Sequence, residues 1–261
     1  MPDDKHKFDI EITTRCNKQC CICPRSNFTR CDRDMTLETF EKICKWLPKD
    51  ADVFFAGYGE PLLHKDHVIF VNRLLHRNIP SSIVTNGKLL SYDKILDLYE
   101  NGLYKLQISV ILKDEENEIS KFVNMIAPQF YRKTQFNLLY DETVKKNEPL
   151  EKALREMGFK VTFKQIHNRG GELYKSSKEY LRDSPCGTFL CVTYIDTEGS
   201  LQICSNDING KYNLGSIETI TFEKLMEMKR QLSLKGDIAP ICKLCDDEYR
   251  LIHLQKQEVK I

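Results

Sequence analysis

Short apolar runs alternate with amphipathic stretches from residue 8 to about residue 165. The runs are rich in β-branched and aromatic residues, as strands are, and the stretches between them have apolar residues at helical spacing. We expect six strands, at 8–12, 52–56, 81–85, 105–110, 135–139 and 160–164. The alternation predicts repeated βα units and therefore a parallel sheet.

Two of the predicted helices have recognisable ends. Thr36 opens the stretch 36–47, and Ser91 opens the stretch 91–102. Both are residue types that cap helix N-termini, and Gly102 is a typical helix stop. Because crossovers between parallel strands are right-handed, the six units would curve into a partial (β/α)6 TIM-type barrel. Its active site would lie at the carboxyl ends of the strands.

The pattern changes after about residue 170. Residues 190–207 predict a β-hairpin with Gly199 in the turn and Cys191 inside the first strand. A helix is expected over 221–232. We therefore expect an α/β chain with two parts, the barrel over 1–170 and a small hairpin and helix domain over 171–261.

Charge and hydropathy exclude several classes of protein. The 39 Lys and Arg residues nearly balance the 38 Asp and Glu residues, so the net charge is +1. No long block of one sign is present, which argues against nucleic acid as a partner. The first residues are charged rather than apolar, and no run of about 18 apolar residues occurs, so neither a signal peptide nor a membrane is expected. We expect a cytoplasmic protein.

Eleven cysteines are too many to be incidental. Without a secretory signal, metal binding explains them better than disulfides do. They form two groups, Cys16, Cys20, Cys21, Cys23, Cys31 and Cys44, then Cys186, Cys191, Cys204, Cys242 and Cys245. His64 and His67 also look like a ligand pair, but we expect them to begin a solvated helix.

The first cysteine group directly follows the first predicted strand. Cys16, Cys20 and Cys23 have the spacing C-x3-C-x2-C. A [4Fe-4S] cluster takes four thiolates, so three would leave one iron open for chemistry. A zinc knuckle that adds Cys21, or a plain cysteine-rich turn, are the alternatives. Adjacent Cys20 and Cys21 cannot easily point at one ion, and we favour the cluster.

Two further motifs end the next two strands. The segment GYGEP, residues 57–61, follows the second strand, and VTNG, residues 84–87, ends the third. Flexible glycines would let backbone carbonyls approach the ammonium of a ligand. Each motif is weak alone, but both would lie at the same mouth as the cysteine loop.

With these motifs the chain resembles the radical S-adenosylmethionine (SAM) superfamily. The resemblance implies that Cys16, Cys20 and Cys23 hold a [4Fe-4S] cluster whose open iron binds SAM, which is split to a 5′-deoxyadenosyl radical. It also implies that Ile22 packs on the adenine. The remaining SAM contacts that it implies are Gly57, Tyr58, Gly59 and Glu60 at the methionine amine, and Thr85, Asn86 and Ser109 at the methionine or ribose.

The later cysteines resemble those of the Twitch domain, a shortened SPASM extension. That resemblance implies that Cys186, Cys204, Cys242 and Cys245 hold an auxiliary [4Fe-4S] cluster. A structural zinc ribbon, or Cys191 in place of Cys186, are the alternatives. The segment NRGG at 168–171 is similar to one in a Twitch enzyme that oxidises an aminocyclitol, and Arg169 would there hold a substrate hydroxyl or developing oxyanion.

Three functions follow from these features. The first is an oxidoreductase that dehydrogenates a hydroxyl-bearing carbon of a sugar-like small molecule, with flavodoxin or ferredoxin as electron donor. The second is a peptide maturase that cross-links or epimerises a ribosomal peptide, although the first strand near residue 8 leaves no room for an N-terminal peptide-binding domain. The third is a non-enzymatic two-cluster electron carrier.

Overall fold

The computed structural model is a mixed α/β structure with one central sheet, and it describes residues 5–141, 143, 147–174, 186–233 and 238–247. The strands run in the order β6-β5-β4-β3-β2-β1-β7-β8-β9. β1 to β7 pair in parallel with one another, and β8 pairs antiparallel with both β7 and β9. The predicted parallel βα architecture is confirmed.

The elements alternate along the chain as the hydropathy pattern predicts. The strands are β1 Lys7–Ile10, β2 Asp52–Phe55, β3 Ser81–Thr85, β4 Lys105–Ile111, β5 Thr134–Tyr140, β6 Lys160–Gln165, β7 Val192–Ile195, β8 Ser200–Gln202 and β9 Asn213–Ser216. The α-helices are α1 Leu37–Trp46, α2 His67–Leu75, α3 Tyr92–Glu100, α4 Leu112–Glu115, α5 Ile119–Met125, α6 Glu148–Glu156, α7 Gly187–Cys191, α8 Phe222–Ser233 and α9 Pro240–Leu244.

The helix ends are also as predicted. Thr36 accepts a hydrogen bond from the backbone of Thr39, and Ser91 accepts one from the backbone of Lys94. Gly102 has a φ of +96°, a conformation that L side chains rarely adopt. These caps fix where the first and third helices begin and end.

The C-terminal hairpin does not form a sheet of its own. Its first strand, β7, pairs in parallel with β1, with Asp9 opposite Tyr194. Gly199 lies in the turn, as predicted, with a φ of +83°. One expectation was wrong: Cys191 is the last residue of α7, not part of the strand, because the chain completes a helical turn before it becomes extended.

The two faces of the sheet differ in polarity. One face carries the apolar core, which includes Phe8, Phe55, Ile108, Phe136 and Leu138. Alternate residues point to the opposite, inner face, because side chains alternate along a strand. There Gln107 and Asn137 form a buried hydrogen-bonded pair, Asn137 Nδ2 to Gln107 Oε1 at 3.1 Å. The outer helices therefore cover apolar residues, and the concave face is polar.

The histidines of the segment 64–67 are not solvated, contrary to expectation. His64 and His67 are both buried. The ring of His64 lies 4.8 Å from that of Phe70, and its Nε2 contacts the carbonyl of Met35 at 2.8 Å. The two histidines pack in the interior because the 3-10 turn at Pro61–Leu63 folds this segment onto α2.

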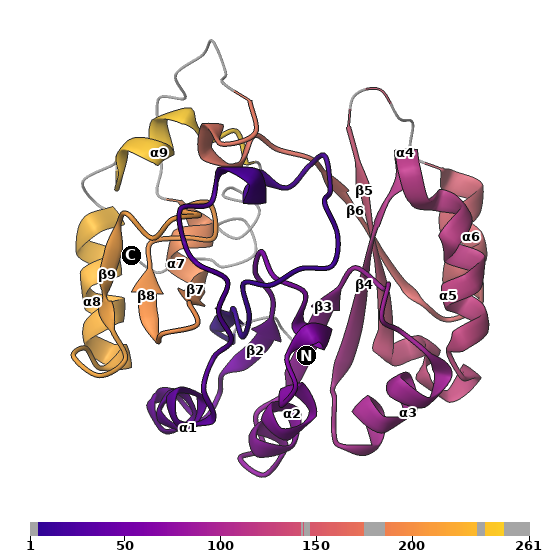
Figure 1. Cartoon of the computed structure of the whole chain (residues 1–261), viewed down its shortest axis with the longest axis horizontal. Coiled ribbons are helices and arrows are strands. Elements are labelled where there is room, and N and C mark those ends of the chain that lie inside the picture. The colour runs from indigo at the N-terminus through magenta and orange to yellow at the C-terminus, as the bar shows by residue number, and fades with distance from the viewer. Residues whose placement is uncertain (1–4, 142, 144–146, 175–185, 234–237, 248–261) are drawn as a thin grey trace.

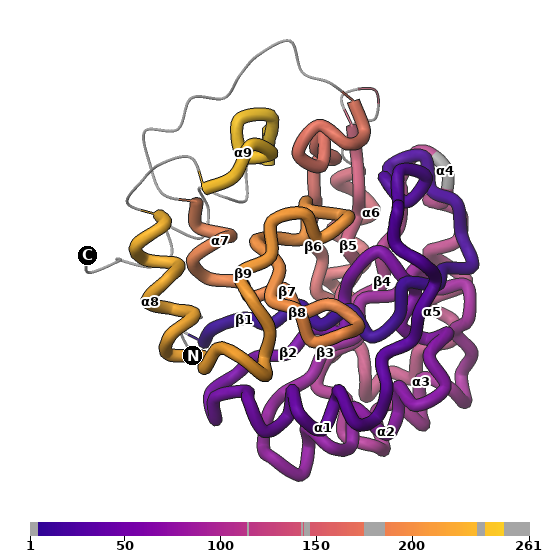
Figure 2. Tube along the Cα trace, turned by 60° about the vertical axis from the view of Figure 1, so that its left-hand side comes forward, coloured from indigo at the N-terminus to yellow at the C-terminus, as the bar shows by residue number. Residues whose placement is uncertain are grey.

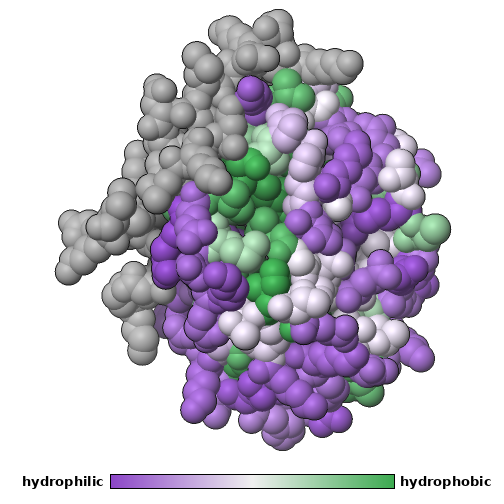
Figure 3. Space-filling view, turned by 90° about the vertical axis from the view of Figure 1, so that its left-hand side faces the viewer, coloured by the Kyte–Doolittle hydropathy of each residue, from purple (hydrophilic) through white to green (hydrophobic). Residues whose placement is uncertain are grey.

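Figure 2 shows α7, α8 and α9 gathered beside β7, β8 and β9, away from the outer helices α1 to α3. On the face that Figure 3 shows, apolar residues gather near the centre, with polar residues to the right of them and below. Within the described residues, no helix combines the length and apolar character needed to cross a membrane.

Candidate active site

The cysteine loop between β1 and α1 lies across the carboxyl ends of the strands (Figure 1). Its base is closed by an antiparallel bridge between Thr13 and Asp34, and Arg15 donates two hydrogen bonds to Asp34, the Nε bond at 2.9 Å. The far side reaches the C-terminal elements, where the Thr29 backbone donates to Asn209 at 2.7 Å. The loop is thus held both at its base and at its far side.

The three predicted ligand thiols lie together on this loop. The backbone of Cys23 donates to the carbonyl of Cys20 at 3.1 Å, and all three residues are partly exposed. Burial raises the pKa of the Cys20 and Cys23 thiols, and the neighbouring thiol of Cys16 adds to the rise. Deprotonation of neighbouring thiols brings like charges together. A bound metal cation offsets that repulsion.

The donor set fits a multi-iron cluster. Within the described residues, no three His, Cys, Asp or Glu side chains converge as the ligands of one ion do. Cluster thiolates bind different irons, so they stand farther apart than the ligands of a zinc knuckle. When bound, a cluster here would supply the electron that cleaves SAM.

The glycines of the GYGE segment bring this loop onto the end of β2. A Cβ on Gly59 would lie 1.9 Å from the carbonyl oxygen of Thr13, and one on Gly57 would lie 2.7 Å from Cγ of Glu11. The backbone of Glu60 also donates to the carbonyl of Arg15 at 2.8 Å. The two glycines therefore allow the GYGE segment to contact the start of the cysteine loop. The sequence motif alone does not reveal this role.

Glu60 joins the ends of β2 and β3. Its carboxylate, 2% exposed, accepts hydrogen bonds from Thr85 Oγ1 at 2.7 Å and from the Asn86 backbone at 2.8 Å. Burial raises its pKa, and these hydrogen bonds oppose the rise. The structure thus brings together three of the residues predicted at the SAM site.

Asn86 also reaches the cysteine loop. Its Nδ2 donates to Asn17 at 2.9 Å and lies 3.8 Å from Sγ of Cys16. Ser109 lies on β4 opposite Asn137 of β5, on the inner face, and Ile22 lies at the tip of the loop, half-buried. Whether these residues contact SAM stays a prediction.

Glu11 and Arg30 are site residues that sequence reasoning missed. Glu11 is buried, accepts from Arg30 Nη1 at 2.6 Å, and also accepts from the Tyr58 backbone at 3.0 Å. Arg30 lies over the ring of Phe28, 4.8 Å from its centre. The sequence contained one signal for this pair. Glu11 is an acidic residue within the predicted strand at 8–12, where an apolar run is expected.

Tyr58 links the two parts of the chain. Its hydroxyl donates to the carbonyl of Ser205 at 2.5 Å, and its buried ring packs edge-on against Phe28. Ser205 directly follows Cys204, so this bond fixes the second cysteine group relative to the GYGE segment.

Arg169 faces the same region. It begins the 3-10 turn Arg169–Gly171 after β6, with a φ of +54° that few non-glycine residues adopt. Asn168 holds this turn, because its Nδ2 donates to the carbonyl of Leu244 at 2.6 Å. The positive charge of Arg169 lowers the pKa of both Cys23 and Tyr58 against the larger effect of burial, so its guanidinium lies near both.

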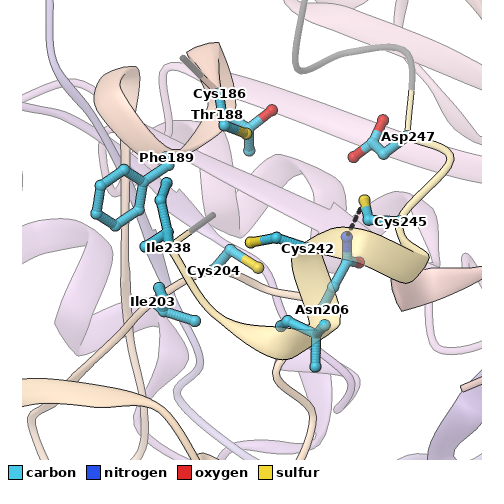
Figure 4. A pocket seen from close by; sticks show the side chains of 11 residues that line it. Cys186, Thr188, Phe189, Ile203, Cys204, Asn206, Ile238, Cys242, Cys245 and Asp247 are labelled. Atoms are coloured by element: carbon cyan, nitrogen blue, oxygen red, sulfur yellow. Dashed lines mark hydrogen bonds between the residues drawn. The ribbon is translucent and has the colours of Figure 1, made fainter. Parts of the chain in front are cut away.

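The second cysteine group lines a cavity between α7, β8 and α9. Figure 4 shows Cys186, Cys204, Cys242 and Cys245 around this cavity. Cys191 does not line it. Burial raises the pKa of the Cys204 thiol, and the other three thiols raise it further.

Two polar atoms at this cavity have no hydrogen-bond partner within the described residues. They are Thr188 Oγ1 and Asn206 Oδ1, and both residues line the cavity. Asn206 Nδ2 donates to Sγ of Cys245 at 3.7 Å. Four thiols with the unsatisfied hydroxyl of Thr188 beside them fit an iron–sulfur group, whose sulfurs accept hydrogen bonds.

The inner face of the sheet offers two titratable groups. Asp9 of β1 and Lys164 of β6 are enclosed by the strands yet partly accessible to solvent. Burial raises the pKa of Asp9 to about 6, and the charge of Lys164 opposes the rise. Burial also lowers the pKa of Lys164.

The fold and site define a parallel α/β protein that carries a thiol-rich loop at the carboxyl end of its first strand. Residues 10–134 match the model of the Radical SAM superfamily, so the chain contains a radical SAM domain.

Several curated proteins are similar to this chain. A tungsten-containing aldehyde ferredoxin oxidoreductase cofactor-modifying protein of Pyrococcus furiosus is 27% identical over 54% of this chain and 40% of its own length. A PqqA peptide cyclase of Bradyrhizobium diazoefficiens is 30% identical over 38% and 27%. The chain spans only 27–40% of the first four curated relatives that it matches.

A longer match is found with an S-adenosyl-L-methionine-dependent 2-deoxy-scyllo-inosamine dehydrogenase of Niallia circulans, 24% identical over 80% of this chain and 77% of that protein. Among solved structures, BtrN in complex with AdoMet and 2-DOIA has a TM-score of 0.68 and 20% identity, and covers 95% of both chains. This likeness establishes the shared fold.

Proposed function

We propose that this protein is a radical SAM dehydrogenase that oxidises a hydroxyl-bearing carbon of an aminocyclitol-like or sugar-like small molecule. The observation that carries the proposal is the four-cysteine cavity beside the cysteine loop. Oxidation of an alcohol removes two electrons, and a cluster with a complete thiolate set would accept the second of them.

The proposed oxidation removes one hydrogen atom, one proton and one electron from the substrate. A cluster held by Cys16, Cys20 and Cys23 would supply the electron that cleaves SAM to methionine and an adenosyl radical. That radical takes the hydrogen atom of the substrate C–H bond and becomes 5′-deoxyadenosine. Asp9 would take the proton of the substrate hydroxyl, and a cluster at the four-cysteine site would take the remaining electron, which gives a carbonyl.

The residues of the mouth would divide the binding tasks. Cys16, Cys20 and Cys23 would hold the first cluster, and Cys186, Cys204, Cys242 and Cys245 the auxiliary one. Ile22, the segment 57–60, Thr85, Asn86 and Ser109 would contact SAM. The three bonds that Glu60 accepts from Thr85, Asn86 and Leu62 would keep this contact surface in place.

Arg169 and Asp9 would act on the substrate. The guanidinium of Arg169, near Cys23 and Tyr58, would hold the oxygen on which charge develops. Asp9 is an inner-face group with a pKa of about 6, close to the range in which a general base is effective, and would accept the hydroxyl proton. The polar inner face also suits a substrate with several hydroxyl groups.

The test is anaerobic turnover with SAM, dithionite and a panel of polyols and aminocyclitols. The proposal expects 5′-deoxyadenosine and a carbonyl product in equal amounts with at least one member of the panel. Formation of 5′-deoxyadenosine without any carbonyl product from the whole panel would contradict it. Flavodoxin or ferredoxin in place of dithionite would test the proposed electron donor.

A peptide-modifying enzyme is the second candidate. Two similarities favour it, the PqqA peptide cyclase relative and a structure of Streptococcus suis SuiB bound to precursor peptide SuiA, with a TM-score of 0.62 and 13% identity. An epimerase would need a thiol as hydrogen donor, and Cys191 is a buried thiol outside the cavity. Loss of deuterium incorporation into a peptide in a Cys191→Ala variant would favour this function.

A further inference from the structure

Lys229 on α8 is a fully buried lysine. It is 0% exposed, and its ammonium donates to the carbonyl of Val192 at 2.7 Å and to Thr193 Oγ1 at 3.1 Å. Within the described part of the chain, no carboxylate forms an ion pair with it; the acidic groups that act on it are the thiols of Cys191, Cys204 and Cys186. A buried charge is costly unless it is paired, so a nearby anion would favour the charged form of Lys229.

The surroundings of the ammonium point to one direction for that anion. Towards β1 lies His6, whose pKa burial lowers to about 3, so its ring is neutral and bonds Thr193 Oγ1 at 2.8 Å. Towards the four-cysteine cavity lies Phe189, whose ring centre is 5.3 Å from the Lys229 nitrogen and which itself lines that cavity. Lys229 therefore stands directly behind the cavity wall.

We propose that the Lys229 ammonium balances the negative charge of the auxiliary [4Fe-4S] cluster and raises its reduction potential. This inference rests on the proposed function, because it requires a cluster bound by four thiolates in that cavity. A four-thiolate cluster is anionic and gains a further negative charge on reduction. A fixed cation nearby stabilises the reduced form more, and net charge is one of the main determinants of cluster potential.

The negative charge of the bound cluster would also keep Lys229 protonated. Burial lowers the pKa of Lys229 to about 7, against the smaller opposing effect of the nearby cysteine sulfurs. Cluster and lysine would therefore stabilise each other's charged forms. A higher potential would make the cluster a better acceptor for the electron that leaves the substrate.

The experiment isolates the auxiliary cluster. In a background in which Cys16, Cys20 and Cys23 are all replaced by Ala, only the four-cysteine site would hold iron. The reduction potential of that cluster is measured by redox titration followed by EPR, for Lys229→Met, which keeps the volume and removes the charge, and for Lys229→Gln, which can still donate to Val192. Lys224→Met is the matched control, because Lys224 is exposed on the same helix.

Both neutral variants should lower the potential by at least 59 mV, a tenfold change in the one-electron equilibrium, while Lys224→Met leaves it unchanged. An unchanged potential in either neutral variant would overturn the inference. So would loss of iron from both with an unaltered far-UV spectrum, because Lys229 would then be structural. If the cysteine-depleted background holds no iron at all, the auxiliary cluster itself is absent and the proposed function fails first.

Discussion

The hydroxyl of Tyr58 donates a hydrogen bond to the carbonyl oxygen of Ser205 at 2.5 Å. This bond joins the end of β2 to the residue that follows Cys204. It therefore couples the region predicted to bind SAM to the cavity predicted to hold the auxiliary cluster.

Replacement of Tyr58 by Phe tests this link. The half-buried carbonyl of Ser205 would lose its donor, at a cost of about 1 kcal/mol in the free energy of unfolding. Urea unfolding of the iron-free protein measures it. Tyr104→Phe is the control, because Tyr104 is 56% exposed and its loss should be neutral. If the two variants have the same free energy of unfolding, the hydrogen bond of Tyr58 does not stabilise the protein.

Gly59→Ala should displace the cysteine loop. The new Cβ would meet the backbone oxygen of Thr13, which cannot move without the loop, whereas the Cβ of Gly57→Ala would meet only side-chain atoms of Glu11. We expect Gly59→Ala to lose the iron of the first cluster and Gly57→Ala to retain most of it. Iron analysis after anaerobic reconstitution measures both, and full iron content in Gly59→Ala would contradict the assigned close approach.

Glu60→Gln should weaken SAM binding. Its carboxylate accepts from three donors, and the amide nitrogen of Gln would face one of them instead of accepting from it. We expect at least a tenfold loss of affinity, about 1.4 kcal/mol, measured by equilibrium dialysis of SAM. Glu156→Gln, an exposed change on α6, is the control. Unaltered affinity would remove Glu60 from the site.

Asp9 predicts a pH dependence of stability. Its pKa of about 6 in the folded protein lies above the ordinary value, so the folded state binds more protons between about pH 4 and pH 6. Stability should therefore fall as pH rises through this window. Asp9→Asn should stabilise the iron-free protein at pH 7 by on the order of 1–3 kcal/mol and by less at pH 4.5.

The measurement for Asp9 is the urea midpoint at both pH values. The exposed Asp50→Asn serves as the control. If the difference in urea midpoint between Asp9→Asn and the unaltered protein is the same at both pH values, burial does not raise the pKa of Asp9. The same variant should slow carbonyl formation if Asp9 accepts the substrate proton.

The sequence predicted the local features of this fold well. All six barrel strands lie within two residues of their expected positions, because each apolar run packs on one helical layer and needs no distant partner to be recognised. The cysteine loop was recognisable because ligand spacing is local. Thr36 and Ser91 marked helix starts for the same reason.

Features that depend on distant contacts were not predictable. The pairing of β7 with β1 joins residues far apart in the chain, and no local pattern encodes it. The Glu11–Arg30 pair needed the loop to fold back over β1, and the burial of His64 needed the turn at Pro61–Leu63. That Gly59 also makes room for Thr13 depends on how the loop folds against the end of β2.

Iron and acid-labile sulfide analysis of the anaerobically reconstituted protein tests the central claim most directly. Two [4Fe-4S] clusters predict about eight irons per chain, falling to about four when Cys16, Cys20 and Cys23 are replaced by Ala, and to about four when Cys186, Cys204, Cys242 and Cys245 are replaced instead. About four irons in the unaltered protein, all lost with the first three cysteines, would contradict the two-cluster account.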